Sequence, residues 1–182
     1  MNIFIASDHA GFELKSFLQQ TLSEIGHTVI DCGAYSYKSD DDYPMYISQA
    51  AKAVSEAEAI RADEDRAFTL VASEKREKNE TRAIVIGGSG TGEAIVANKY
   101  PHVRAAICYG GDSASDIVRL SREHNNSNVL SLGARFLSDD EALELVLLWI
   151  NTEFTGDERH VRRLHEVEII DNKVIICNTI FY

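Results

Sequence analysis

Short apolar runs recur along this chain and are separated by longer segments with helical periodicity. Five runs are rich in β-branched and other apolar residues and predict buried strands: Met1–Ser7, His27–Cys32, residues 83–87, Val103–Cys108 and Asn128–Leu132. Because strands alternate with helices, the pattern predicts an α/β fold: a three-layer Rossmann-like sandwich with a five-stranded parallel sheet and helices on both faces.

The C-terminal region is less regular. Arg159 and Arg163 are spaced i, i+4 and would lie on one face of a helix. Beyond them, Val167–Ile170 and Lys173–Cys177 flank Asp171-Asn172, which predicts an additional terminal hairpin.

Polar residues follow several of the predicted strands. Asp8-His9, a glycine-rich loop after residue 86, Tyr109-Gly110 and Gly133-Ala134-Arg135 all come where a strand ends. In parallel sheets, ligands bind beyond the carboxyl ends of the strands. We therefore expect these segments to meet at one edge of the sheet.

Composition limits the classes of partner. The chain has 182 residues, which predicts one domain over 1–182, and a formal net charge of −11, which argues against nucleic-acid and anionic membrane surfaces. Its three cysteines lack metal-ligand spacing, and it has neither a predicted signal peptide nor a membrane span, so we expect a cytoplasmic protein. Binding an anion would then depend on a local basic cluster, of which the densest is Arg159–Arg163.

The glycine-rich loop, Gly87-Gly88-Ser89-Gly90-Thr91-Gly92, is the most informative stretch. Its backbone N–H groups and the following helix N-terminus suit an anion. Glu93 and Ala94 stand where a nucleotide-binding P-loop has Lys and Ser/Thr, and Glu93 also replaces the third glycine of a dinucleotide fingerprint. A nucleotide-binding module is therefore a distant alternative.

Several further motifs occur in a fixed order along most of the chain. They are Ser7–Lys15, Asp42-Tyr43-Pro44, the glycine loop, Ala97-Asn98-Lys99, Arg104-Ala105-Ala106, Glu123–Asn126, Leu132–Arg135 and Arg159–Arg163. In this combination the chain resembles the B-type ribose-5-phosphate isomerases and the related galactose-6-phosphate isomerase subunits.

The resemblance implies an enzyme: a cofactor-independent aldose–ketose isomerase that interconverts ribose 5-phosphate and ribulose 5-phosphate, as in the pentose phosphate pathway. Such chemistry needs neither a metal nor a redox cofactor, because a base moves a proton between carbons through an enediolate. Two alternatives stay open: a hexose-6-phosphate (galactose or allose) isomerase, and a non-catalytic sugar-phosphate-binding or partner subunit.

Glu93 is the candidate carbon base. One branch of the family uses a cysteine at the start of the glycine loop, where this chain has Gly87, and the chain resembles the branch that uses a glutamate six residues later. The alternative is that Glu93 only complements a helix N-terminus.

The resemblance also implies roles for other residues. His124 is the candidate acid/base for opening the sugar ring, although a helix cap is the alternative. The predicted substrate-binding residues are Asp8, His9, Tyr43, Gly88, Ser89, Gly90, Gly92, Asn125, Arg135, Arg159 and Arg163. Among them, the three arginines would hold the phosphate, since guanidinium groups pair bidentately with phosphate oxygens.

Two further implications concern assembly and a departure from the family. Family members are homodimers, sometimes paired into tetramers, whose active sites borrow residues from the neighbouring subunit. The segment at about 54–82 is some twenty residues longer than is usual there, and 14 of its 29 residues are charged. We interpret it as a solvated helix with a surface loop; a role in oligomerisation or in covering the active site is the alternative.

Overall fold

A sheet of five parallel strands lies at the centre of the structure, in the order β2-β1-β3-β5-β4. The computed structural model describes residues 1–68 and 80–179, with side chains for 1–62 and 80–170. The strands are β1 (Asn2–Ser7), β2 (Thr28–Asp31), β3 (Thr81–Gly87), β4 (Ala105–Cys108) and β5 (Val129–Gly133). All five predicted strands and their parallel pairing are confirmed.

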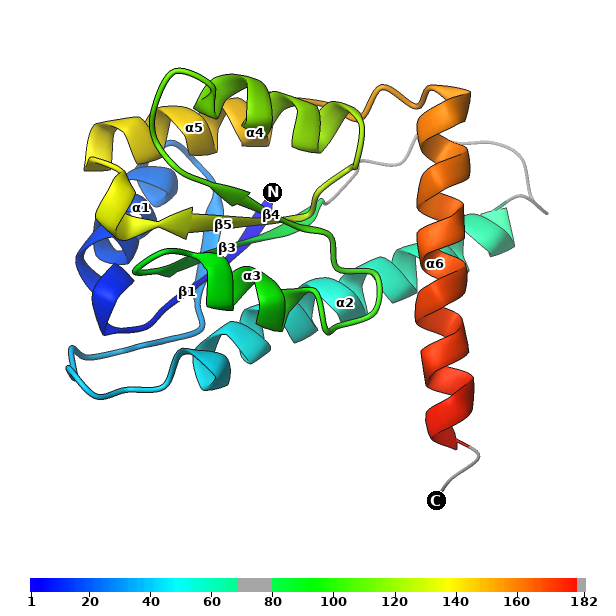
Figure 1. The fold of residues 1–182 in the computed structure, drawn as a ribbon, viewed down its shortest axis with the longest axis horizontal. Coiled ribbons are helices and arrows are strands. Elements are labelled where there is room, and N and C mark those ends of the chain that lie inside the picture. The colour runs from blue at the N-terminus through cyan, green and yellow to red at the C-terminus, as the bar shows by residue number, and fades with distance from the viewer. Residues whose placement is uncertain (69–79, 180–182) are drawn as a thin grey trace.

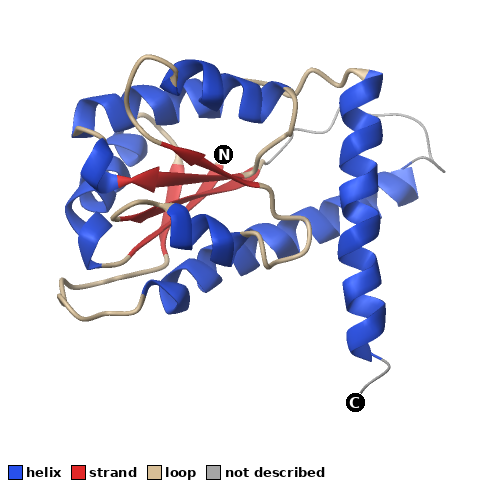
Figure 2. Cartoon of the chain, in the orientation of Figure 1, coloured by secondary structure: helices blue, strands red, loops and turns tan. Residues whose placement is uncertain are grey.

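Helices cover both faces of this sheet. The elements are η1 (His9–Gly11), α1 (Phe12–Glu24), α2 (Tyr43–Phe68), α3 (Thr91–Ala97), α4 (Ala114–Glu123), η2 (Ala134–Phe136), α5 (Asp139–Asn151) and α6 (Glu158–Thr179). Helices α1, α4 and α5 pack on one face, and α2 and α3 pack on the other (Figure 1). Figure 2 shows the strands enclosed between these two layers, the predicted three-layer sandwich.

Alternate residues of the central strands serve two separate cores. In β3, Ile84 and Ile86 belong to the core under α1, α4 and α5, whereas Ala83 and Val85 belong to the core under α2. Successive side chains of a strand point to opposite faces, so a strand buried on both faces is apolar throughout. This explains the continuous apolar runs of the sequence.

The predicted C-terminal hairpin is wrong, because α6 runs as one helix from Glu158 to Thr179. Short β-branched runs such as Val167–Ile170 suit a strand or a helix equally, and Asp171-Asn172 is not followed by the glycine that a tight turn favours. Figure 1 shows α6 beside the end of the sheet from which the strands begin.

The charged segment at 54–82 begins within α2, where Val54 is still fully buried against the sheet. Its residues 69–79 lie outside the described part of the chain, so the interpretation as a helix with a surface loop stays a prediction. In the part that the structure describes, no helix combines the length and the apolar character needed to cross a membrane.

A buried arginine ties the start of β3 to the end of α5. Arg82, 4% exposed, donates hydrogen bonds to the backbone oxygens of Trp149 (2.9 Å) and Ile150 (3.1 Å). It also pairs with Glu80 at 2.7 Å and lies 5.1 Å from the centre of the Trp149 ring. The guanidinium thereby satisfies carbonyl groups that the last turn of a helix leaves without partners.

Replacing this arginine should cost substantial stability. We expect Arg82→Ala to lower the free energy of unfolding by about 3 kcal/mol, because it leaves Glu80 and two helix-end carbonyls unpaired. The matched control, Arg119→Ala, removes an exposed arginine paired with Asp116 and should cost less than about 0.5 kcal/mol. Urea unfolding monitored by circular dichroism measures both, and equal losses would contradict this account.

Candidate active site

The carboxyl ends of the strands meet at one edge of the sheet, as the sequence predicted. Arg135, in η2 after β5, donates its backbone N–H to the oxygen of Gly88 in the loop after β3 at 3.2 Å. Tyr109, after β4, packs against Gly133 and exchanges a 2.9 Å hydrogen bond with Thr91. Three strand ends are thus joined directly by contacts between their loops.

Three glycines of the loop either have a left-handed backbone or lie close to another side chain. Gly90 has a φ of +71° and precedes α3. A Cβ at Gly88 would lie 3.2 Å from the guanidinium carbon of Arg135, and one at Gly92 would lie 2.7 Å from the hydroxyl of Tyr43. The loop can therefore bring backbone N–H groups, an arginine and a tyrosine to one ligand.

Glu93 lies in the first turn of α3 and is 4% exposed. Its carboxylate fills the space beside Gly87, where an added Cβ would stand 1.8 Å from Oε1. Burial raises the pKa of Glu93 above its ordinary value, the carboxylate of Asp8 adds to the rise, and a hydrogen bond from the backbone of Glu93 itself opposes it. A buried carboxyl group with a raised pKa beside the glycine-rich loop suits proton abstraction.

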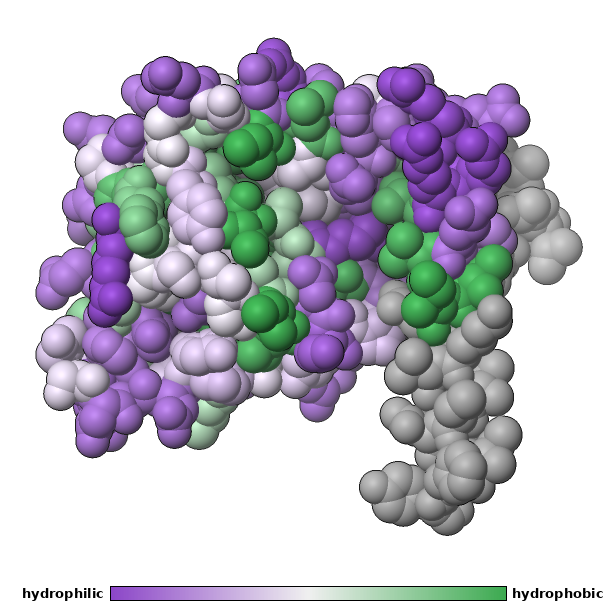
Figure 3. Space-filling view, viewed as in Figure 1, coloured by the Kyte–Doolittle hydropathy of each residue, from purple (hydrophilic) through white to green (hydrophobic). Residues whose placement is uncertain are grey.

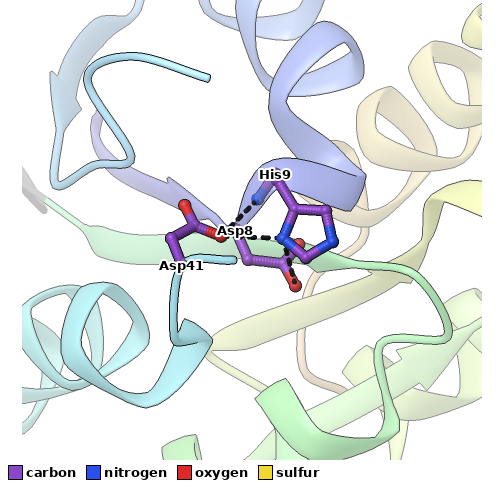
Figure 4. A group of neighbouring side chains, drawn as sticks. All are labelled: Asp8, His9 and Asp41. Atoms are coloured by element: carbon purple, nitrogen blue, oxygen red, sulfur yellow. Dashed lines mark hydrogen bonds and ion pairs between the residues drawn. The ribbon is translucent and has the colours of Figure 1, made fainter. Parts of the chain in front are cut away.

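Asp8 and His9 follow β1 at the same edge, and the structure joins them to Asp41 (Figure 4). Asp8 caps η1 by accepting the N–H groups of Ala10 (2.9 Å) and Gly11 (3.3 Å), a role beside the substrate contact predicted for it. His9 Nδ1 lies 2.8 Å from Oδ1 of Asp41.

Sequence reasoning missed Asp41, because it lies 32 residues from His9 within a run of three aspartates that reads as solvated loop. Ligand atoms of Asp8, His9 and Asp41 lie within 4.8 Å of one another, a spacing that could hold a divalent cation. The hydrogen bond between His9 and Asp41 already accounts for the approach of these two side chains.

The other predicted residues lie at the opposite edge of the sheet. His124 caps the C-terminus of α4, and its ring stacks on that of His160 with 4.2 Å between centroids. Asn125 beside it is exposed, as are Arg159 and Arg163 on the first turns of α6. Burial, together with His124 and the neighbouring arginines, lowers the pKa of His160 and favours its neutral form.

The distance between the two groups follows from the elements that separate them. Helix α4 starts near the glycine loop and runs back 10 residues, or about 15 Å, before it reaches His124. Strand β3 spans seven residues, or roughly 20 Å, from the opposite edge to the loop. One chain therefore brings together Asp8, His9, Tyr43, the glycine loop, Glu93 and Arg135, and leaves His124, Asn125, Arg159 and Arg163 apart.

Comparisons with known proteins agree with this geometry. The family model described as Ribose/Galactose Isomerase matches residues 3–62 and 65–167. The chain is 37% identical over 165 residues to ribose-5-phosphate isomerase B of Mycolicibacterium paratuberculosis, covering 90% of this chain and 87% of that protein. It is 33% identical to the Escherichia coli protein of the same name over 171 residues, covering 94% and 97%.

Solved structures give the same result. The crystal structure of ribose-5-phosphate isomerase B from Mycoplasma genitalium with bound ribulose-5-phosphate matches with a TM-score of 0.78 and 30% identity, covering 94% of this chain and 96% of that one. The Clostridium thermocellum ribose-5-phosphate isomerase B matches with a TM-score of 0.77 and 36% identity, covering 96% and 99%.

The raised pKa of Glu93 makes a prediction about stability. Because the folded protein favours the protonated carboxyl group, its stability should fall as the pH rises from about 4.5 through the pKa of the folded state and then level off. Each unit of elevation destabilises the ionised form by about 1.4 kcal/mol. We expect Glu93→Gln to be more stable than the wild type at pH 7, with the difference shrinking towards pH 4. Unfolding in urea at several pH values measures this, and a difference that does not change with pH would contradict it.

Proposed function

The chain belongs to the ribose/galactose isomerase family, and on this premise we propose that it is a cofactor-independent isomerase of ribose 5-phosphate and ribulose 5-phosphate. The observation that carries the proposal is the buried carboxylate of Glu93, with its raised pKa, beside the glycine loop. The names of the relatives support the five-carbon substrate, and a ribulose-5-phosphate complex is known for the Mycoplasma genitalium protein.

In the proposed mechanism, Glu93 takes the proton from C2 of the open-chain aldose and returns it to C1, while the hydroxyl proton of O2 passes to O1. Negative charge develops on the substrate oxygens in the enediolate, and the N–H groups of Gly88, Gly90 and Gly92 stabilise it. The Oγ of Ser89 accepts the N–H of Thr91 at 3.3 Å, which leaves the hydroxyl hydrogen of Ser89 available to the substrate.

The space beside Gly87 supports Glu93, rather than a cysteine, as the base. A side chain at position 87 would collide with the carboxylate, since its Cβ alone would stand 1.8 Å from Oε1. A side chain at position 87 and Glu93 in this buried orientation therefore compete for the same space, which supports the glutamate branch. Cys108, the last residue of β4, is 1% exposed, and burial raises its pKa to about 11, so it suits the core rather than catalysis.

The position of the second group supports a homodimer with composite sites. His124, Asn125, Arg159 and Arg163 are too far from Glu93 to share a substrate with it in one chain. In a two-fold dimer, the same four residues of the partner subunit would complete each site. They would supply the ring-opening acid/base, a donor to substrate oxygens and two phosphate-binding arginines, while Arg135 and His9 bind the phosphate from the first subunit.

Exposed apolar side chains fit such an interface. Ile95 on α3 is 57% exposed, and on α4 Ile117 and Leu120 are 51% and 42% exposed. On α6, Val161 and Ile170 are also exposed. Figure 3 shows hydrophobic side chains gathered on the face that carries α3 and α4, and again on the described part of α6. Apolar surface of this kind favours association with another chain.

The proposal is tested by an isomerase assay in EDTA with ribose 5-phosphate, allose 6-phosphate, galactose 6-phosphate and free ribose. We expect turnover of ribose 5-phosphate without added metal, because a carboxylate base and N–H donors suffice for an enediolate. Preference for a hexose phosphate would overturn the assignment of ribose 5-phosphate as the substrate. The family description, which names both ribose and galactose, keeps that possibility open. Saturable binding without turnover would favour a sensor or partner subunit.

The control for this assay is Glu93→Gln, which keeps the shape of the side chain and removes the base. It should bind ribose 5-phosphate with nearly unchanged affinity and lose about 10²–10⁴-fold in kcat. Near-normal turnover would remove Glu93 from the role of base.

Mixing two inactive variants tests the composite site. Glu93→Gln damages the glycine-loop half, and Arg159→Ala damages the half that we assign to the partner. A heterodimer of the two has one site with both changes and one site with neither, so random reassociation at equal amounts should restore about a quarter of wild-type activity. Subunits are exchanged by brief incubation in mild denaturant. If each site lay within one chain, the mixture would be no more active than its components.

A further inference from the structure

Asp41 is a buried acid whose partner in the described structure is His9. Its side chain is 3% exposed, and its Oδ1 accepts two hydrogen bonds, from the backbone N–H of His9 at 3.0 Å and from Nδ1 of His9 at 2.8 Å. The other oxygen, Oδ2, is buried without a hydrogen-bond partner. Figure 4 shows Oδ1 directed at His9 and the second oxygen directed away from it.

Stability does not account for this arrangement. Removing a carboxylate from water costs free energy unless its acceptor sites are filled, and half of those of Asp41 are not. The two hydrogen bonds from His9 fill acceptor sites of Oδ1 alone, so they compensate only part of that cost. A buried group that is kept at such a cost points to a role in the neighbouring site.

The effect of Asp41 on His9 is specific. An ionised carboxylate can only accept hydrogen bonds, so Nδ1 of His9 must carry the hydrogen of the 2.8 Å contact. Nε2 is then the ring nitrogen left for a ligand, and in Figure 4 it lies on the side of the ring away from Asp41. The second bond to Oδ1 fixes the backbone of His9 as well, so the orientation of the ring follows that of the main chain.

Neighbouring groups restrict the ring further. Tyr37 packs edge-on against it with 6.4 Å between centroids, and Oδ2 of Asp8 lies 4.0 Å from Nδ1. The segment η1, which carries His9, contacts η2, which carries Arg135. His9 is therefore held from the side of the β2–α2 loop, and its segment adjoins the one that carries the arginine of the candidate active site.

We propose that Asp41 is a positioning residue: it fixes the tautomer and orientation of His9 so that Nε2 meets the phosphate end of the substrate. The contact of His9 with substrate rests on the function proposed above, whereas the control of His9 by Asp41 does not. Asp41 itself touches neither the reacting carbons nor the base.

The test compares three variants. Asp41→Leu removes both acceptors, Asp41→Asn keeps an oxygen that can accept both hydrogen bonds, and Asp40→Leu is the matched control at the exposed neighbouring aspartate. Ring ¹⁵N NMR at about pH 8.5, well above the ordinary histidine pKa of ~6.5, reports the tautomer, with the His9 signals assigned from His9→Gln. Steady-state kinetics with ribose 5-phosphate and urea unfolding are measured on the same samples.

We expect the wild type and Asp41→Asn to show hydrogen on Nδ1 of His9, and Asp41→Leu to shift towards the Nε2–H tautomer. Asp41→Leu should raise KM about tenfold, the effect of losing one well-placed hydrogen bond to a charged ligand, and change kcat less than about threefold. Asp41→Asn should recover most of the KM. Asp41→Leu leaves the backbone N–H of His9 without its partner, so a modest loss of stability is expected as well, whereas Asp41→Asn should unfold at nearly the wild-type urea concentration.

Other results would overturn the proposal. An unchanged His9 tautomer in Asp41→Leu, combined with a loss of stability, would make Asp41 a structural residue. A loss confined to kcat would mean that Asp41 acts on the chemistry rather than on binding. If the wild type turns over no sugar phosphate, the proposed function fails, and the NMR comparison still decides whether Asp41 controls His9.

Discussion

The close contact between the carboxylate of Glu93 and the bare backbone of Gly87 is the constraint on which the candidate active site depends. With Glu93 in this orientation, a Cβ at the end of β3 would meet Oε1 at 1.8 Å, so glycine there leaves room for the buried carboxylate. The contact also buries the carboxylate near Asp8, and burial is the leading cause of its raised pKa. The same contact thus gives the proposed base its buried position and, through that burial, its raised pKa.

The rest of the fold keeps this contact in place. Strand β3 is buried on both faces by two separate cores, so the end that carries Gly87 has little freedom to move. Arg82 anchors the beginning of the same strand to the carbonyl groups that end α5. Ionisable groups therefore serve two purposes at the two ends of one strand: a paired, buried cation stabilises its start, and a buried carboxyl group beside its end is the candidate for chemistry.

The position of His124 and of the arginines of α6 gives the proposed homodimer a chemical reason. In a chain with a net charge of −11, a phosphate needs a local set of cations, and within one subunit Arg135 is separated from Arg159 and Arg163 by the length of the sheet. Pairing two subunits by a two-fold axis would bring these cations to one phosphate. The isolated subunit would then hold the base and the enediolate donors but only part of the phosphate site.

The sequence by itself determined the sheet, the helical layers, the glycine loop and the family, because each depends on local periodicity or on motifs whose residues are adjacent. It also indicated Glu93 as the candidate base, since this residue directly follows the glycine loop in the chain. It did not determine the secondary structure of the segment that forms α6. The β-branched runs there are compatible with a strand or a helix, and long-range packing makes the choice.

Only the tertiary structure decided which of the predicted residues meet. It brought Asp41 to His9 across 32 residues, a contact with no signature in an acidic loop. It also placed His124 at the far end of α4, away from Glu93, although both lie in motifs that the sequence displays. Local patterns determine which segments form helices and strands. Each helix then runs back along the sheet, and this tertiary arrangement determines at which edge of the sheet its C-terminal residues lie.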